Sequence, residues 1–332
     1  MLDQYHPYSL PEDVGGLVRS FSEGSLNTGF VPRALKPRLE ACKLEIFPDY
    51  VFTDEENLSA LERDRLVDHV ETVAQKSALN FALAMSWSHT QTALGDDELS
   101  PYSIVDAILD FRNLSLQTSI SKNADRPSTQ ALLVERPGAK RIRPHPLQIP
   151  GRDTRADFCY CFNPSQPEWS LFYDNWNRSN KAQSYNLSPF DSERAVDIIP
   201  CCFVQVEPFS GGYLEAQVQG TELSMATLRN LMQVRSTLGV PDPEGQLVGS
   251  SPMDLKPLPF ITVVGQIWSL HWAYKREDNT IDIIGPVNIG GTYSYGSIYK
   301  LVNAIAKLKD WLETEYGVWV KKWYSECFAQ ES

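Results

Sequence analysis

Long apolar runs are missing from this 332-residue sequence. No stretch approaches the eighteen or so apolar residues that a helix needs to cross a bilayer. The opening MLDQYHPYSLPEDVGG also lacks the basic segment followed by an apolar stretch that marks a secretory leader. We therefore expect no membrane partner, a cytoplasmic location and reduced cysteines.

Basic residues are outnumbered by acidic ones, and the net charge is −12. A chain with this net charge has no general attraction to phosphate, so we exclude a protein that coats DNA without regard to sequence. A local basic patch could still bind RNA or DNA. The stretch ERPGAKRIRPHPLQIPGRDTR is either a solvated loop or a phosphate-binding patch, and its basic residues are Arg136, Lys140, Arg141, Arg143, Arg152 and Arg155.

Several common site motifs are also missing: the chain has no P-loop, GxGxxG, HExxH or GxSxG and no internal repeat. The six cysteines include no CxxC pair. On strands, Cys159 and Cys161 would share one face, whereas the adjacent Cys201 and Cys202 would face opposite ways. Four thiolates would not converge on zinc from these positions, so we predict small buried apolar side chains instead.

The residues that are present predict a substantial core, because 42% are hydrophobic and 11% aromatic. We expect an irregular N-terminal arm over 1–52 and a single α/β domain over 53–332, with helices packed on a mixed central sheet. A long polar and aromatic insertion occupies 164–198, and we expect it to be a loop. The predicted helices are 54–90, 102–111, 213–236 and 297–325, and the predicted strands are 131–135, 157–163, 199–207, 259–274 and 280–288.

Four stretches in this order resemble the fungal PD-(D/E)XK nuclease-like family. They are RADF at 155–158, IPCCFVQVEPFSGG at 199–212, EAQVQG at 215–220, and PFITVVGQIWSLHWAY with the following GSIYKLVNAIAKLKDWLETEYGVWV. The resemblance covers about 155–325 and implies a restriction-endonuclease-like fold. In that family an aspartate and a second acid on neighbouring strands hold a divalent metal, usually Mg²⁺, and a lysine two residues after the second acid assists.

The family's residues transfer to this chain only in part. Asp157 matches the strand-opening aspartate and Glu207 the second acid, but the position two residues later holds Phe209 instead of lysine. In the other register Gln205 replaces the acid and Glu207 the lysine. Glu71 resembles the helix glutamate, and Gln219 resembles a polar residue of the following helix. The alternation of side chains along the two strands would place Asp157 and Glu207 on one face. The alternative interpretation is that Glu207 only caps the end of its strand and Asp157 only pairs with Arg155.

Three functions remain open at this point. A metal-dependent nuclease fits the fold and would need Mg²⁺, and a binding module without catalysis fits the missing lysine. We rank first an enzyme similar to the fungal arginine-containing cyclodipeptide synthases, which take arginyl-tRNA and a second aminoacyl-tRNA as partners and need no cofactor or metal. Its chemistry requires a base and an acidic pocket, for which we predict Glu207, Asp157 and Glu71, and a basic tRNA surface over 136–155. Lysines of the last predicted helix could also form that surface, Ser210 is a candidate nucleophile, and His271 is predicted to be a core residue.

Overall fold

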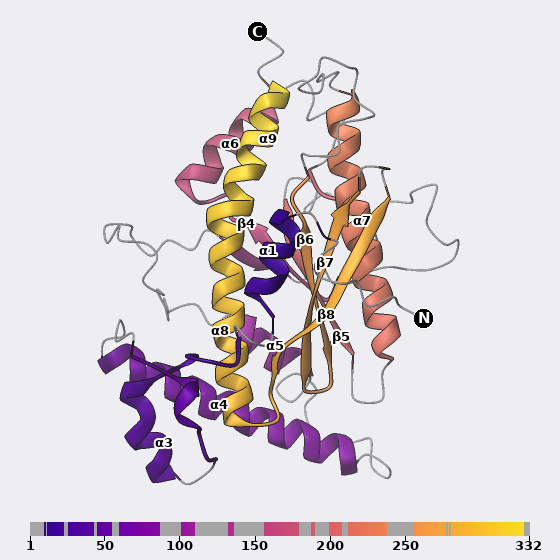
Figure 1. Cartoon of the computed structure of the whole chain (residues 1–332). Coiled ribbons are helices and arrows are strands. Elements are labelled where there is room, and N and C mark those ends of the chain that lie inside the picture. The colour runs from indigo at the N-terminus through magenta and orange to yellow at the C-terminus, as the bar shows by residue number, and fades with distance from the viewer. Residues whose placement is uncertain are drawn as a thin grey trace.

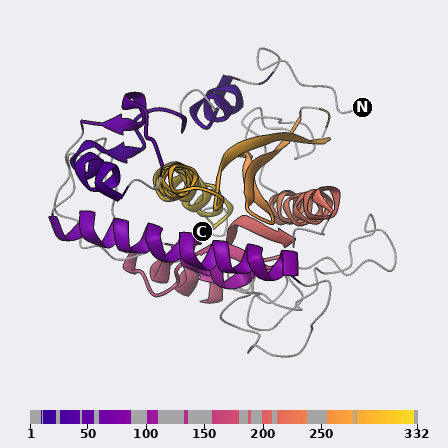
Figure 2. The same ribbon diagram turned by 90° about the horizontal axis from the view of Figure 1, so that it is seen from below.

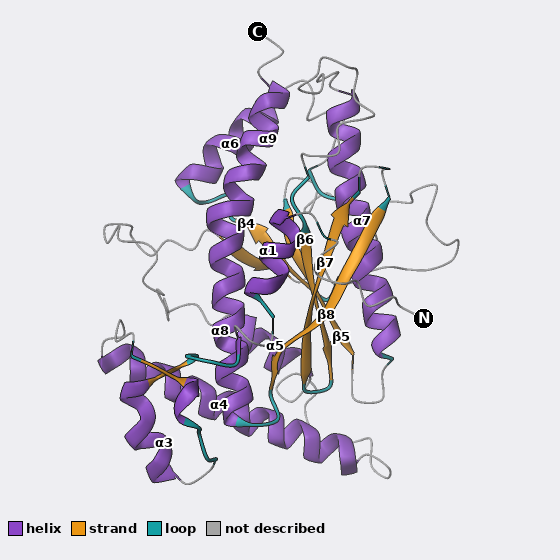
Figure 3. Cartoon of the chain, viewed as in Figure 1, coloured by secondary structure: helices purple, strands orange, loops and turns teal. Residues whose placement is uncertain are grey.

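The structure, a computed structural model, alternates strands and helices around one central sheet (Figures 1 and 3). The described residues are 10, 12–22, 26–42, 45–54, 60–86, 101–109, 132–135, 156–178, 187–189, 199–207, 212–237, 255–276, 278 and 280–328.

Six strands form the central sheet, in the spatial order β3-β4-β5-β6-β7-β8. Strands β5 and β6 run parallel and the other neighbours run antiparallel, so the sheet is mixed, as predicted. Both faces of β5 are buried, which is typical of parallel strands covered by helices on each side. The strands are β3 (Leu132–Glu135), β4 (Phe158–Phe162), β5 (Pro200–Glu207), β6 (Leu258–Val264), β7 (Ile267–Lys275) and β8 (Ile281–Gly291).

One face of the sheet is covered by α7 (Tyr213–Thr237), which makes the crossover between the parallel strands β5 and β6. Figure 2 shows α7 on one side of the sheet and the C-terminal helices, seen nearly end-on, on the other. The helix approaches closely at Gly220, where an added Cβ would lie 2.3 Å from Cδ2 of Phe260. The predicted helix 213–236 is therefore confirmed, and the glycine in its third turn permits the contact.

The opposite face is covered by aromatic residues of the C-terminal helices. Helix α8 (Tyr295–Trp311) continues through a π-helical turn at Leu312–Tyr316 into α9 (Gly317–Phe328), so the predicted helix 297–325 is nearly continuous. Trp272 of β7 meets Trp311 edge-on, with ring centroids 5.3 Å apart. Phe162 of β4 lies between Trp169 and Tyr316, at centroid distances of 4.0 Å and 6.3 Å. Two further helices border this layer, α4 (Ala60–Ser86) and α5 (Pro101–Leu109).

The N-terminal segment corrects the prediction of an irregular arm over 1–52. Its described part contains short elements, and side chains such as Phe21, Val31 and Phe52 belong to the core. Glu45 ties the segment to the start of α8, because its carboxylate accepts from the amide of Gly296 at 3.0 Å and from the hydroxyl of Ser294 at 3.3 Å. Proline and glycine, both within these short elements and between them, hid the elements from an analysis of periodicity. The elements are α1 (Glu12–Ser20), β1 (Val31–Pro32), η2 (Arg33–Leu35), α3 (Lys36–Cys42), η3 (Asp49–Val51) and β2 (Phe52–Thr53).

Two other expectations need correction. The insertion 164–198 contains a helix, α6 (Pro167–Arg178), whose buried Trp169, Tyr173 and Trp176 fall on one helical face. The single strand predicted over 259–274 is two strands, β6 and β7, joined at Gly265, whose φ of 58° favours glycine. The hairpin predicted around KREDN joins β7 to β8 as expected.

No helix in the described parts of the chain is both long enough and apolar enough to span a bilayer.

Candidate active site

Asp157 and Glu207, which we call the acid pair, lie at adjoining ends of β4 and β5. Oδ2 of Asp157 accepts a hydrogen bond of 2.8 Å from the amide of Val206, so this carboxylate lies against the residue that precedes Glu207. Phe158 pairs with Val204, and one further step in this antiparallel register places Asp157 across from Gln205. Glu207 follows two positions later, on the same face. The structure thus brings together the two acids that the sequence singled out, and their catalytic role stays a prediction.

A tyrosine that sequence reasoning missed contacts Asp157. The hydroxyl of Tyr102, in the first turn of α5, donates to Oδ1 of Asp157 at 3.3 Å, and its ring lies 6.0 Å from that of Phe158. Both oxygens of the Asp157 carboxylate are therefore held by hydrogen bonds. The only signal in the sequence was an aromatic residue that also carries a hydroxyl at the start of a predicted helix.

The acid pair lies at the end of the sheet where the parallel strands β5 and β6 finish. The carbonyl of Glu207 accepts from the amide of Gly265 at 2.9 Å, in the turn after β6. The next residue, Gln266, donates from Nε2 to Oγ of the buried Ser77 on α4 at 2.7 Å, and Ser77 donates to Oγ1 of Thr292 at 2.8 Å. Ligand sites of α/β proteins commonly form at the carboxyl ends of such strands.

Glu71 does not join the acid pair. It lines a cavity of about 10 Å³, the space of a single water, whose other walls come from the N-terminal segment, α4 and α8. Its ion-pair partner there is Arg38 of α3, with Nη2 3.9 Å from Oε1. Among the described residues Glu71 makes no polar contact with Asp157 or Glu207, so the predicted role of a third active-site acid is not supported by its position.

Gln219 lies on α7, the helix that covers the face of the acid pair. Its side chain is half-buried, and Nε2 donates to Oε1 of Glu215 at 3.1 Å, one turn earlier on the same helix. Because this hydrogen bond is local, the structure gives Gln219 a place beside the sheet without a contact to either acid of the pair. Its assignment as a site residue stays a prediction.

The predicted tRNA-binding residues lie outside the described residues, as does Ser210. They are Arg136, Lys140, Arg141, Arg143, Arg152 and Arg155. The lysines offered as another basic surface are partly engaged by the fold. The ammonium of Lys309 donates to the carbonyl of Leu109 at 2.9 Å, Lys307 donates to the carbonyl of Ser20, and Lys321 pairs with Glu168 at 2.9 Å. We therefore give these three lysines a structural role.

The cysteines of β4 and β5 are buried thiols, as predicted. Sγ of Cys161 lies 3.5 Å from Sγ of Cys159, and burial raises the pKa of Cys159, Cys201 and Cys202. In the described part of the chain, no group of three or more His, Cys, Asp or Glu is placed to hold a metal ion. The thiols of Cys159, Cys201 and Cys202 thus stay protonated, and all four cysteines serve as core side chains.

The architecture itself defines a class of protein. An antiparallel meander, a crossover helix to a parallel strand, and helices on both faces form a restriction-endonuclease-like α/β fold. The family model described as PD-(D/E)XK nuclease superfamily matches residues 103–317, which is 215 of the 332 residues. The chain belongs to this superfamily. No curated protein and no solved structure gives a significant match.

Proposed function

We propose that the chain is an aminoacyl-tRNA-dependent cyclodipeptide synthase of the cyclo-Arg-Xaa type, built on a nuclease-like scaffold. One observation carries the proposal: Asp157 is held against the strand that ends in Glu207, while the lysine of the superfamily is absent in either register. The finer resemblance, to the fungal arginine-containing synthases, belongs to this proposal. A superfamily that acts on nucleic acids supports a substrate delivered on tRNA.

Two neighbouring carboxylates suit a cationic substrate. A carboxylate pairs with guanidinium through two parallel hydrogen bonds, which would select an arginyl group. A carboxylate can also take a proton from an α-ammonium group before the amine attacks. We assign these two tasks to the acid pair, without Glu71, because Arg38 already holds that side chain.

The reaction balances without a cofactor. The amine of one aminoacyl group attacks the ester carbonyl of the other, an amide bond forms, the ester bond breaks, and the 3′ hydroxyl of one tRNA leaves. The proton given up by the amine passes to the acid pair and then to the leaving oxygen. A second, intramolecular attack closes the ring and releases the other tRNA.

A second candidate is a Mg²⁺-dependent nuclease, which membership of the superfamily favours. Mg²⁺ in protein sites is commonly bound through one or two carboxylates with water and phosphate, and Asp157 and Glu207 could supply these. The metal would polarise the phosphate and activate water. The missing lysine removes the group that in this superfamily neutralises charge on the phosphate.

The test incubates the purified protein with a complete tRNA-charging mixture and labelled arginine, followed by mass spectrometry for cyclic dipeptides. We expect a cyclo-arginyl product that disappears after RNase treatment. Glu207→Gln and Asp157→Asn should each abolish it, whereas Asp174→Asn, an exposed carboxylate on α6, should leave it unchanged. Cleavage of the tRNA or of added DNA with Mg²⁺, and no product, would instead establish the nuclease. Neither activity would favour a binding module.

A further inference from the structure

Polar side chains cross the sheet beneath α7. Gln205 of β5 pairs in register with Thr262 of β6, and Thr262 with Ser269 of β7. All three side chains are buried, with 6% or less of their surface exposed. Burying polar groups is costly unless they are hydrogen-bonded, and departures from an apolar core are expected where a protein has a functional site. Residues opposite each other share a face, so this polar row lies on the face of the acid pair.

A histidine next to the polar row links it to the surface. Nε2 of His271 lies 3.1 Å from Oγ1 of Thr262 and 3.5 Å from the hydroxyl of Tyr213. The imidazole is fully buried and stacks on Phe260, with ring centroids 4.6 Å apart and an interplanar angle of 4°. Its position is thus fixed by packing on one side and by two hydroxyls on the other. This histidine is a core residue, as the sequence indicated.

The surroundings of Nδ1, the other ring nitrogen, determine which nitrogen of His271 carries the proton. Nδ1 of His271 is buried, lies against Gly285, and has no hydrogen-bond partner among the described residues. A buried N–H without a partner is rarer and more costly than a buried acceptor, so the proton belongs on Nε2. Nε2 then donates towards the two hydroxyls, and each hydroxyl keeps its own proton for another acceptor.

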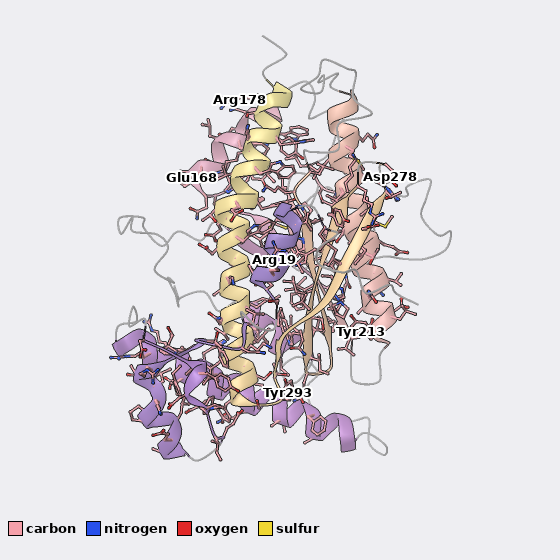
Figure 4. All side chains as sticks on the ribbon, viewed as in Figure 1. Arg19, Glu168, Arg178, Tyr213, Asp278 and Tyr293 are labelled. Carbon is pink, nitrogen blue, oxygen red and sulfur yellow. The ribbon has the colours of Figure 1, made fainter. Side chains whose placement is uncertain are left out.

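The hydroxyl proton of Tyr213 is available at the surface of the protein. This tyrosine is the first residue of α7, 38% of its surface is exposed, and His271 is its only hydrogen-bond partner in the described part of the chain. Figure 4 places Tyr213 at the first turn of α7, beside the sheet. The phenol is protonated at neutral pH, and burial raises its pKa further. The hydroxyl therefore remains a donor, not a base.

Tyr213 is connected to the acid pair both along the chain and through a series of side-chain contacts. In sequence, it follows Glu207 by six residues, since β5 ends at Glu207 and α7 begins at Tyr213. In space, its hydroxyl contacts Nε2 of His271, and the same nitrogen contacts Oγ1 of Thr262. Thr262 is the cross-strand partner of Gln205, which lies two residues before Glu207. The Tyr213 hydroxyl and the acid pair thus lie on the same face of the sheet, the face under α7, with Thr262 and Gln205 between them.

We propose that Tyr213 is a further catalytic residue of the proposed synthase, donating its hydroxyl proton in a hydrogen bond to the ester carbonyl oxygen of the aminoacyl group, and that His271 is its positioning residue. This assignment rests on the proposed function. As the amine attacks, negative charge develops on that oxygen, and a donor already in place stabilises it more than it stabilises the ester. The phenol shares its proton throughout and does not transfer it, so the proton balance of the reaction is unchanged.

The test compares product formation by the full-length wild type and Tyr213→Phe over a range of aminoacyl-tRNA concentrations. Removal of one such donor should lower kcat by roughly 100-fold with little change in KM. Tyr293→Phe is the matched control, because Tyr293 is also an exposed tyrosine, and it should react like the wild type. Equal thermal unfolding of the variants would exclude a folding defect.

His271 is tested through Tyr213. His271→Gln keeps an N–H donor near Nε2 and should cost less activity than His271→Leu, which has none. Because the histidine acts through the phenol, the double variant Tyr213→Phe, His271→Leu should be no slower than Tyr213→Phe alone. Additive losses would overturn the positioning role. A wild-type kcat in Tyr213→Phe would overturn the catalytic role while the proposed function stands, and a wild type that forms no product would remove both.

Discussion

The two faces of the sheet differ in the chemistry of their packing. The face under α8 and α9 is aromatic, with contacts such as Trp272 against Trp311. The face under α7 contains the polar row, His271 and the acid pair. Burial of aromatic rings contributes much to the free energy of unfolding, whereas hydrogen-bonded buried polar groups contribute little. Buried polar groups are therefore expected where a protein has a functional site. We conclude that the aromatic face mainly stabilises the fold, and the other face is the one on which we propose the active site.

The largest expected effect comes from the aromatic face. Trp272→Ala removes a fully buried ring that meets both Trp311 and Phe21, and such truncations cost about 3–5 kcal/mol. Urea unfolding followed by fluorescence would measure the loss. Leu171→Ala, on an exposed side chain of α6, should change the free energy of unfolding by less than about 0.5 kcal/mol. A Trp272→Ala protein as stable as the control would contradict the division between the faces.

The second largest effect is expected at acid pH, where His271 on the α7 face should lower the free energy of unfolding. Burial lowers the pKa of His271 to about 4, against 6.5 in the unfolded chain. Between these values the unfolded chain binds the proton and the folded chain does not. The free energy of unfolding should therefore be full above pH 6.5 and fall as the pH drops towards 4, by about 3 kcal/mol at most. Unfolding of wild type and His271→Gln across this window should show a shallower fall in the variant, and parallel curves would oppose the prediction.

A smaller loss is expected where α7 meets the sheet. Gly220→Ala gains helix propensity, but its Cβ would lie 2.3 Å from the ring of Phe260, which stacks on His271. Overpacking of this kind costs about 1–3 kcal/mol and should also lower activity by shifting His271. Gly16→Ala in α1 is the control, because an added Cβ there meets nothing within 4 Å. It should stabilise the protein slightly.

The smallest effect concerns the surface outside the aromatic face. Lys321 pairs with Glu168 and lies 4.6 Å from the centroid of Trp169. Lys321→Gln should cost below about 1 kcal/mol, because such exposed ion pairs contribute little. If its role is structural, tRNA affinity measured by filter binding should not change. A clear loss of affinity would return this lysine to the nucleic-acid surface.

The sequence predicted those parts of the fold that carry a strong period. Strand β5 and helix α7 were visible because apolar residues run continuously in the first and recur at helical spacing in the second. The helix α6 was missed although Trp169, Tyr173 and Trp176 have helical spacing, because neighbouring polar residues suggested a loop. Gly265 was read as a strand residue, since one glycine in an apolar run does not reveal a reversal of direction.

Of the candidate site, only the placing of Asp157 and Glu207 on one face could be predicted from the sequence. The alternation of side chains along the strands was enough to place Asp157 and Glu207 together. It could not place Glu71, because α4 lies far from these strands in the sequence and packs against α8. Tyr213 and Tyr102 carry no pattern of their own. Their relevance comes from tertiary contacts with His271 and Asp157, which no local spacing encodes.

The contact between Glu45 and the start of α8 joins residues 251 positions apart. During synthesis the N-terminal segment leaves the ribosome long before Gly296 is made, and at about 5–20 residues per second the delay is on the order of tens of seconds. Over that time Phe21 and Phe52, which belong to the finished core, have no C-terminal layer to cover them. The nascent chain therefore spends a period in which a chaperone could hold this segment, whose contact with α8 can form only after Gly296 has been made.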